Sequence, residues 1–377
     1  MTPFSGLLFF YVMGLLLSPA VVLGLLEKPL KHYGLLFTVL MIAFVFGENG
    51  QFLQLAIFFL WEVTLCFLYL HIHKRSSFTL TLSLALSLMP LVAAKVGEIY
   101  RSFDMFQFLG VSYMTFRSVQ VIIDIHDGKI KQLGFLDTSY FLLFFPSVAS
   151  GPIDRYQRFL SDLNRKISRE EYIDILRRGV WKLAFGALSG IVIGGFIWNQ
   201  WLVPLPTEGL RATISYMYGY TFYLFFNFAG YSSMAIGTAY ILGITLPENF
   251  RIPFLSTDMK DFWSRWHISL STWLRDYVYI RFVMGSLKAN RFKNKRTASY
   301  LGYIVNMMIM GAWHGLTPAY LLYGVYHSVL ICLNEALDLH WKPFRKLKQN
   351  ELTQIVLAVV TFHLFSFGLL IFSGRLI

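Results

Sequence analysis

Charged residues are scarce in this chain. Only 14% of its 377 residues are Asp, Glu, Lys or Arg, whereas 56% are hydrophobic. A soluble protein of this length would carry roughly a quarter charged residues, so the composition excludes an ordinary soluble protein. The apolar residues form continuous runs rather than an alternating pattern, which excludes a transmembrane β-barrel. The sequence therefore predicts an all-α polytopic membrane protein.

Cysteine and the common cofactor motifs are also nearly absent. The two cysteines, Cys66 and Cys332, each lie in an apolar run, which argues against a disulfide framework or a zinc site. The sequence has no phosphate-binding loop, dinucleotide fingerprint or nucleophile elbow. We therefore expect no metal ion and no permanently bound cofactor, although a serine–histidine–acid triad made from distant residues stays open.

Acidic residues are outnumbered by basic ones, 21 to 33, which gives a formal net charge of +12. The basic residues cluster in short loops between apolar runs, and no basic domain of the size that nucleic-acid binding needs is present. This distribution excludes a nucleic acid as the partner and indicates contact with anionic membrane lipids.

Apolar runs determine the organisation of the chain. They cover approximately residues 5–26, 34–46, 52–71, 77–96, 105–123, 138–150, 174–203, 212–243, 299–315, 318–338 and 352–373. A helix needs about 20 residues to cross a bilayer, so the run 138–150 is expected to be re-entrant or interfacial. The first run lacks a basic leading segment, so we expect a retained span rather than a signal peptide.

The loops between these runs alternate between rich and poor in Lys and Arg. Placing the rich loops in the cytoplasm requires about ten crossings, with the N-terminus and the C-terminus outside. We expect one domain, 1–377, without a linker or repeat. Within it, residues 244–298 are too polar for a span and are expected to form a partly embedded helical segment on the cytoplasmic side.

Two motifs, Trp266-His267 and Trp313-His314, place a histidine beside a tryptophan in or next to membrane-spanning sequence. Ionisable groups at membrane depth are costly to keep there and are functional candidates by default. Imidazole also suits proton transfer near neutral pH. His314 and His267 are therefore the candidate catalytic residues.

His314 lies about 15 residues into its run, roughly 20 to 25 Å along a helix, and so past the middle of the membrane. Gly311, Gly315 and Pro318 are expected to loosen the helix and let another group approach closely. The alternative interpretation is a structural histidine that is bonded to a backbone carbonyl of a neighbouring helix.

His267 lies in the segment 261–277, whose large apolar residues recur at helical spacing and predict an amphipathic helix. These residues are Trp266, Leu270, Trp273, Leu274 and Tyr277. The alternative is an interfacial helix anchored by its tryptophans, with His267 at the water boundary. The histidines at 71, 73, 126, 327, 340 and 363 lack motif support.

An apolar cluster follows in a strongly basic segment. It consists of Phe282, Val283, Met284 and Leu287, and Arg291 is among the cations that surround it. An apolar patch rimmed by cations indicates a docking face for an acidic protein. A short interfacial helix on anionic lipid is the alternative.

Four stretches, 108–117, 144–153, 263–277 and 310–315, together resemble the membrane-bound O-acyltransferase family over nearly the whole chain. Within it, the chain is most similar to the branch that esterifies lipoteichoic acid with D-alanine. The polysaccharide O-acetylating branch is also similar, but it typically carries a Pro- and Gly-rich loop where this chain has residues 280–285 and a basic run. That departure favours the D-alanyl branch.

The resemblance implies a ring of helices around a central funnel and tunnel, in the plasma membrane of a Gram-positive bacterium. It implies that His314 is the principal catalytic histidine and His267 the second one. The donor would be D-alanine, held as a thioester on the phosphopantetheine arm of a small acidic cytoplasmic carrier protein. That carrier would dock around Val283 and Met284.

The same resemblance implies lipoteichoic acid as the acceptor and other membrane proteins of the same pathway as further partners. It also implies that burial keeps His314 uncharged and available as a base. Three alternatives remain: a polysaccharide O-acetyltransferase of the same family, a transporter or flippase of an acylated intermediate, and a scaffold for the carrier.

Overall fold

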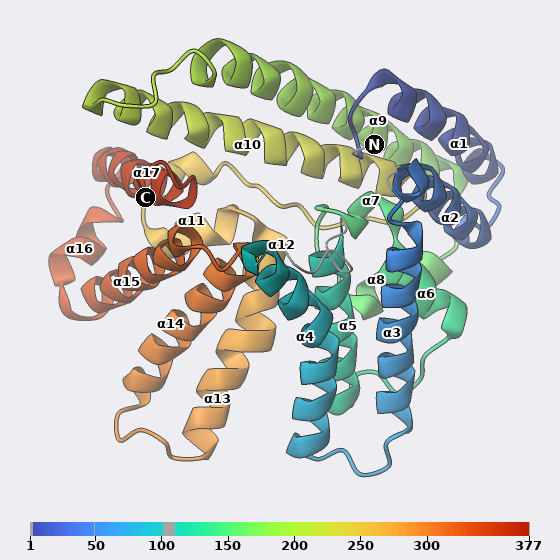
Figure 1. Ribbon diagram of the computed structural model, residues 1–377, viewed down its shortest axis with the longest axis horizontal. Coiled ribbons are helices and arrows are strands. Elements are labelled where there is room, and N and C mark those ends of the chain that lie inside the picture. Colours follow the sequence, from blue (N-terminus) through green and yellow to red (C-terminus); the bar gives the residue numbers. More distant parts are fainter. Residues whose placement is uncertain (1–2, 49, 101–109, 377) are drawn as a thin grey trace. The chain divides into compact units, whose positions relative to one another are not determined.

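The computed structural model describes residues 3–48, 50–100 and 110–376 (Figure 1). Within these ranges the secondary structure is helical, apart from an isolated bridge between Phe250 and Trp266. The predicted all-α fold class is therefore confirmed. Phe108 and Leu109 of the first motif, and the start of the run 105–123, lie outside the described residues. The chain forms two compact units, residues 1–191 with 228–247 (unit 1) and residues 192–227 with 248–377 (unit 2).

Unit 1 contains the N-terminal helices. They are α1 (Leu7–Leu25), α2 (Lys31–Glu48), α3 (Phe52–His71), α4 (Ser77–Tyr100), α5 (Val111–His126), α6 (Phe135–Leu143), α7 (Phe145–Val148), α8 (Tyr156–Asn164), α9 (Arg169–Ala187) and the start of the π-helical segment η1 (Leu188–Gly194). The second half of α10 (Leu210–Ile241) also belongs to unit 1. The predicted short run 138–150 is divided between α6 and α7, neither of which is long enough to cross a bilayer.

Helices α3, α4 and α5 pack side by side in unit 1 (Figure 1). Two buried polar side chains inside this bundle form hydrogen bonds that join its helices, which offsets the cost of burying them. The Ser87 hydroxyl donates to a carboxylate oxygen of Glu62 at 2.7 Å, which joins α4 to α3. Arg117 is 1% exposed and donates to the carbonyls of Phe141, Leu142 and Ser147, which fastens α5 to α6 and α7.

Unit 2 contains the C-terminal helices and the predicted helical segment 244–298 from residue 248 onward. Its elements are η2 (Ile197–Leu202), the first half of α10, η3 (Pro253–Leu255), α11 (Met259–Arg265), α12 (Ile268–Leu274), η4 (Arg275–Tyr279), α13 (Ile280–Lys288), α14 (Lys295–His314), α15 (Pro318–His340), α16 (Lys342–Leu347) and α17 (Glu351–Phe372). Helix α14 packs along α13 and along α15, and α15 also contacts α17.

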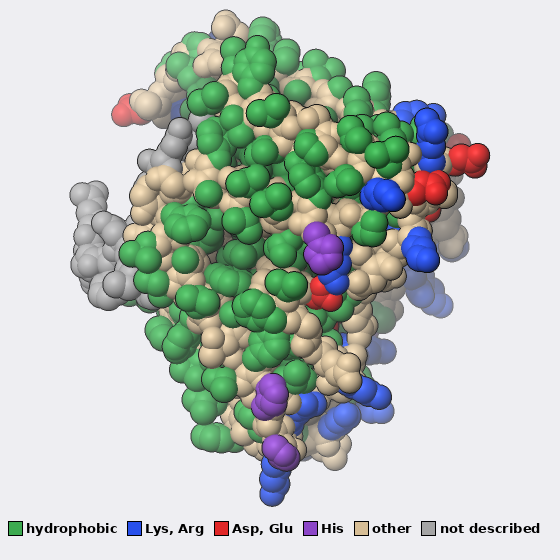
Figure 2. Space-filling view, turned by 90° about the vertical axis from the view of Figure 1, so that its right-hand side faces the viewer, with side chains coloured by type: hydrophobic (Ala, Val, Ile, Leu, Met, Phe, Trp, Pro, Cys, Tyr) green, Lys and Arg blue, Asp and Glu red, His purple; other side chains and the backbone are tan. Residues whose placement is uncertain are grey.

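Five helices among the described residues are long and apolar enough to cross a membrane. They are Leu7–Leu25, Phe52–His71, Ser77–Glu98, Arg169–Leu202 and Glu351–Phe372. Large apolar side chains on them are exposed, such as Leu7 on α1 and Leu352 and Ile355 on α17. Figure 2 shows one face on which hydrophobic side chains dominate and Lys and Arg gather at the right-hand and lower margins. The protein is therefore a multi-pass membrane protein, while the count of about ten crossings stays a prediction.

Candidate active site

The backbone breaks at Trp266 and His267, between α11 and α12. His267 has φ 45° and ψ 51°, in the left-handed region. The amide of Ile268 donates to the Asn249 carbonyl at 3.0 Å, and the amide of Arg251 donates to the Arg265 carbonyl at 3.0 Å. The prediction of one continuous helix over 261–277 is therefore wrong: the backbone on both sides of His267 bonds to the strand-like segment 249–251 instead of continuing the helix.

The indole of Trp266 anchors this break. It is 5% exposed and lies among phenylalanine rings, with centroid separations of 5.1 Å to Phe250, 5.6 Å to Phe262 and 4.7 Å to Phe365. The predicted apolar face survives the break, since Leu270, Trp273 and Leu274 are also buried.

His314 is the last residue of α14, where the chain reverses into α15. Gly315 follows it and Pro318 opens α15. The imidazole lies against three aromatic rings, with centroid separations of 6.0 Å to Tyr320, 6.3 Å to Tyr323 and 4.8 Å to Phe372. The predicted close approach beside His314 occurs at Gly311, where an added Cβ would lie 2.6 Å from the carbonyl oxygen of Tyr320.

Trp313 connects the two histidine motifs. Its ring centroid lies 4.4 Å from that of His314 and 6.2 Å from that of His267. The two motifs, which are separate in the sequence, therefore meet at one indole ring within unit 2. Two imidazoles around one aromatic ring form a site at which a proton can be taken up and a polar substrate group oriented.

The two histidines differ in accessibility. His267 is 4% exposed, whereas His314 is half-buried. We expected burial to keep His314, the principal histidine, uncharged. The structure instead buries His267 fully and leaves His314 half-buried. A half-buried imidazole can be reached by a substrate hydroxyl, and a buried one is better suited to holding an orientation. Among the described residues, no group of three metal-ligating side chains is placed to hold a metal ion.

A cluster of ion pairs holds the start of α11, which we call the α11 clamp. It consists of Asp258, Lys260, Asn334, Glu335, Asp338 and Lys348. The Lys348 ammonium lies 2.5 Å from Asp258 and 2.6 Å from Asp338, and the amide of Met259 donates to Asn334 at 3.0 Å. Sequence analysis missed this clamp because its members come from α11, α15 and the turn after α16.

The pKa of Lys348 reflects the clamp. Burial lowers the pKa of this ammonium, but its hydrogen bonds and charge interactions with Asp258 and Asp338 outweigh burial, so the pKa lies above its ordinary value. Lys260 shows the same balance. Burial lowers its pKa, but Glu335 and the neighbouring aspartates outweigh burial, so the pKa of Lys260 also lies above its ordinary value. Both lysines are therefore charged at neutral pH and bind α11 to α15.

His327 is a residue that sequence motifs did not single out. It is 0% exposed, and its ring lies 5.2 Å from that of Trp263 and 4.5 Å from that of Tyr323, which also contacts His314. Neither of its ring nitrogens has a hydrogen-bond partner among the described residues. The sequence did offer one signal for His327: it follows Tyr323 by four residues, so both side chains lie on the same face of α15.

Three polar residues that lie near the histidine motifs in the sequence, Asp276, Tyr277 and Asn306, differ in their surroundings. Asp276 pairs with Arg275 at 2.9 Å, and the ring of Tyr277 lies 5.1 Å from that of Trp273. Asn306 is 9% exposed on α14, and its side-chain oxygen has no hydrogen-bond partner among the described residues. Of the three, Asn306 shares a helix with His314.

The predicted docking residues lie on α13 and in the turn after it. Met284 is 49% exposed, and Arg291 is exposed as well. Val283 points toward α14 instead, because an added Cβ at Gly302 would lie 2.9 Å from its Cγ2. Phe282 and Leu287 are half-buried. The accessible part of the predicted face is therefore Met284 with the cations after α13, while Val283 packs within unit 2.

Comparison with known families identifies the chain's relatives. The model of the membrane-bound O-acyltransferase family matches residues 67–374, a range that includes both histidine motifs. This match confirms the resemblance drawn from the four sequence stretches.

Three individual relatives cover from 63% to 100% of this chain. The teichoic acid D-alanyltransferase of Bacillus subtilis strain 168 is 40% identical, covering 100% of this chain and 98% of the relative. The protein of the same name from Streptococcus thermophilus is 34% identical, covering 99% and 95%. A probable alginate O-acetylase of Pseudomonas syringae pv. tomato is 32% identical over 63% of this chain and 44% of that protein.

Proposed function

Because the chain belongs to the membrane-bound O-acyltransferase family and is therefore a membrane acyltransferase, we propose that it transfers D-alanine to teichoic acid. The donor in this proposal is a D-alanyl thioester on the phosphopantetheine arm of a small acidic carrier protein in the cytoplasm. The acceptor is a hydroxyl of lipoteichoic acid outside the cell. The full-length similarity to two teichoic acid D-alanyltransferases supports this choice of substrate.

The observation that carries the proposal is the shared contact of Trp313 with His314 and His267. In the proposed step, His314 accepts the proton of a glycerol hydroxyl as its oxygen attacks the thioester carbonyl. The carbon–sulfur bond breaks, the ester forms, and the departing thiolate receives that proton from His314 to become the free thiol of the carrier. His267 holds the thioester in position. A covalent acyl-enzyme is the alternative order of events.

The proposal includes the surroundings of the site. About ten crossings would form a ring around an outward funnel and a narrow tunnel, with both termini outside a Gram-positive plasma membrane. Threading the phosphopantetheine arm into such a tunnel would avoid carrying a charged, activated amino acid across the bilayer. The carrier would dock on Met284 and the cations after α13, where its acidic surface would meet Arg291. Phosphopantetheine enters with the carrier and is not a resident cofactor.

The test is transfer by the purified protein in lipid vesicles. It uses carrier loaded with radiolabelled D-alanine, lipoteichoic acid, and three variants: His314→Ala, His314→Gln and, as a matched control, His340→Ala. His340 is an exposed histidine at the end of α15. We expect both His314 variants to lose roughly 10²- to 10⁴-fold in rate, the usual contribution of a general base, and the control to keep its activity.

Polysaccharide O-acetylation is the second candidate, because the probable alginate O-acetylase also matches this chain. The same vesicles supplied with an acetyl donor and no carrier distinguish the two. Transfer of acetyl groups without carrier, and none of D-alanine with it, would overturn the D-alanyl assignment. Label that crosses the membrane but stays off the polymer would favour a transporter.

A further inference from the structure

A cavity of about 680 Å³ lies in unit 1, and none of its lining residues belongs to the histidine motifs. It is lined by three connections, residues 24–32 between α1 and α2, residues 162–168 between α8 and α9, and residues 242–244 after α10. The volume is in the range of small-ligand sites. None of the steps proposed for acyl transfer uses this cavity.

The lining of the cavity carries an excess of positive charge. Lys31 and Arg165 have carboxylate partners, at 2.5 Å to Asp137 and 2.6 Å to Glu171. The side chains of Lys28 and Lys166 form no ion pair or hydrogen bond with another described residue. Two uncompensated ammonium groups at one cavity are an electrostatic site for an anion.

The acidic groups of the lining are already engaged. A carboxylate oxygen of Glu27 accepts the backbone amide of Arg169 at 2.8 Å, at the start of α9. A carboxylate oxygen of Asp162 accepts the backbone amide of Thr245 at 2.7 Å. Asp162 also pairs with Arg158 and with Arg165, each at 3.6 Å. Neither carboxylate forms an ion pair with Lys166 among the described residues.

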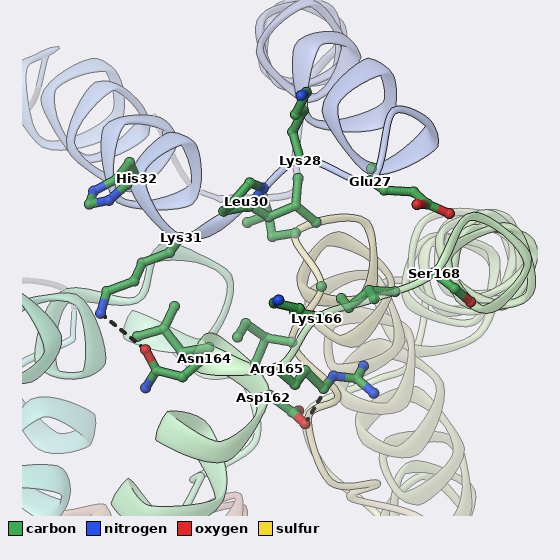
Figure 3. Close-up of a pocket in the computed structure, with 17 residues that line it drawn as sticks. Glu27, Lys28, Leu30, Lys31, His32, Asp162, Asn164, Arg165, Lys166 and Ser168 are labelled. Atoms are coloured by element: carbon green, nitrogen blue, oxygen red, sulfur yellow. Dashed lines mark hydrogen bonds and ion pairs between the residues drawn. The ribbon is translucent and has the colours of Figure 1, made fainter.

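Figure 3 shows how the basic side chains are arranged. The side chain of Lys166 extends toward the middle of the cavity, whereas Lys28 stands beyond Leu30 with its ammonium turned outward. The guanidinium of Arg165 lies on the same connection as Lys166, and its Nη2 is buried without a hydrogen-bond partner among the described residues. The Lys166 ammonium therefore offers its donors to an anionic group inside the cavity, the Arg165 guanidinium is turned toward Asp162, and Lys28 adds charge at the rim.

The position of the cavity in the chain indicates where the anion comes from. The cavity adjoins the end of α1 and the start of α9, which pack against each other and belong to candidate membrane spans. Apolar side chains beside it face outward, including Val22 and Leu26 at the end of α1 and Ile173 on α9. A ligand with an anionic head and aliphatic tails fits a charged cavity at the end of two apolar helices.

We propose that this cavity binds the phosphodiester headgroup of an anionic glycerophospholipid, with Lys166 as the principal charge partner and the acyl chains along α1 and α9. The lipid belongs to the leaflet at this end of the two helices, which the predicted orientation makes the cytoplasmic one. The bound phosphate then lies beside the α8–α9 connection, which carries Lys166.

The experiment measures lipid binding to the delipidated full-length protein in a non-ionic detergent. Native mass spectrometry and thermal unfolding are recorded with phosphatidylglycerol and with phosphatidylcholine of the same acyl chains. Wild type is compared with Lys166→Gln, Lys28→Gln and the control Lys342→Gln. The control removes an exposed lysine at α16 whose side chain has no ion pair with another described residue. A further arm supplies glycerol phosphate, the soluble form of the same headgroup chemistry.

We expect phosphatidylglycerol, and not phosphatidylcholine, to bind wild type and raise its melting temperature. Lys166→Gln should weaken this binding by about fivefold, the effect of one lysine near an anionic surface, and Lys342→Gln should leave it unchanged. Equal binding of the two lipids, or an equal loss in Lys342→Gln, would overturn the proposal. Full stabilisation by glycerol phosphate alone would assign the cavity to a soluble phosphate compound instead of a lipid.

Discussion

The ring centroids of His267 and Trp313 lie 6.2 Å apart, although His267 precedes α12 and Trp313 lies near the end of α14. The contact depends on the helix break at His267 and on the chain reversal after His314. Two irregular backbone positions therefore create the site, because regular helices would continue past both residues.

Because the backbone of His267 is left-handed, substitutions can test its chemical role separately from its structural one. This conformation costs most L-residues roughly 1–2 kcal/mol of conformational free energy, whereas glycine adopts it freely and asparagine tolerates it. We expect His267→Gly and His267→Asn to keep the melting temperature within a few degrees and to lose at least tenfold in D-alanyl transfer. A well-folded His267→Gly protein with full transfer would reduce His267 to a residue that only shapes the turn.

Gly311 is the position where α14 comes closest to α15. An added Cβ would lie 2.6 Å from the Tyr320 carbonyl oxygen, a backbone atom that cannot easily move. We expect Gly311→Ala to lower stability by about 1–3 kcal/mol, as overpacking does, and to reduce transfer through displacement of His314. The matched control is Gly285→Ala on α13, where nothing lies within 4 Å of an added Cβ. Its melting temperature should stay equal or rise, and equal losses in both variants would contradict the packing argument.

Lys348 should stabilise the α11 clamp through its two carboxylate partners. We expect Lys348→Ala to cost roughly 1.5–3 kcal/mol, the usual range for hydrogen bonds to charged groups, and Lys346→Ala, an exposed neighbour, to cost little. The pKa of Lys348 is raised in the folded protein, so its contribution is fully present below the unfolded pKa near 10.4. It is lost as pH rises through the higher folded pKa.

Thermal unfolding of wild type and Lys348→Ala checks this pH dependence. The difference in melting temperature should be constant from pH 7 to pH 9 and should shrink above about pH 10.5. A difference that disappears by pH 8, where Lys348 is still charged, would show that its ion pairs do not cause the difference. Lys346→Ala provides the baseline at each pH.

Met284 and Arg291 test the docking face, and this prediction depends on the proposed carrier. We expect Met284→Asp and Arg291→Glu to raise the KM for the loaded carrier at least tenfold and to change kcat little, since both act on binding. Lys346→Glu is the control, because it reverses the charge of an exposed lysine elsewhere in unit 2. An unchanged KM in the first two variants would place the carrier on another surface.

His327 offers a test of a buried polar ring without partners. His327→Phe keeps an aromatic ring of similar size and removes two nitrogens that lack hydrogen-bond partners among the described residues. Because such nitrogens are costly to bury, we expect an equal or higher melting temperature and retained transfer. A tenfold loss of transfer at unchanged melting temperature would instead assign His327 a role in the chemistry.

Much of the architecture could be predicted, since it depends on patterns within short stretches. Runs of apolar residues predicted helices. The short run 138–150, which was not expected to cross the membrane, lies in the two short helices α6 and α7. The turn after Trp313-His314 was visible in Gly315 and Pro318. Each of these features is determined by residues that are close together in the sequence, so the sequence alone indicates it.

The site's surroundings could not be predicted in the same way. The break at His267 requires Asn249, whose backbone carbonyl accepts the Ile268 amide, and the helical spacing of the segment hid it. The contact between His314 and Phe372 joins α14 to α17. Val283 looked like part of an exposed patch, because the sequence does not tell which side of α13 faces α14.

The contact of Phe372 with His314 also constrains when this protein can become active during synthesis. The ribosome makes α11 and α14 well before α17, so a nascent chain that has inserted both histidine motifs still lacks the ring against His314 and the Phe365 ring against Trp266. The ion pair of Asp258 likewise cannot form until Lys348 has been synthesised. Assembly of the site is therefore a late event in biogenesis, and a translation product truncated before α17 should be inserted but inert.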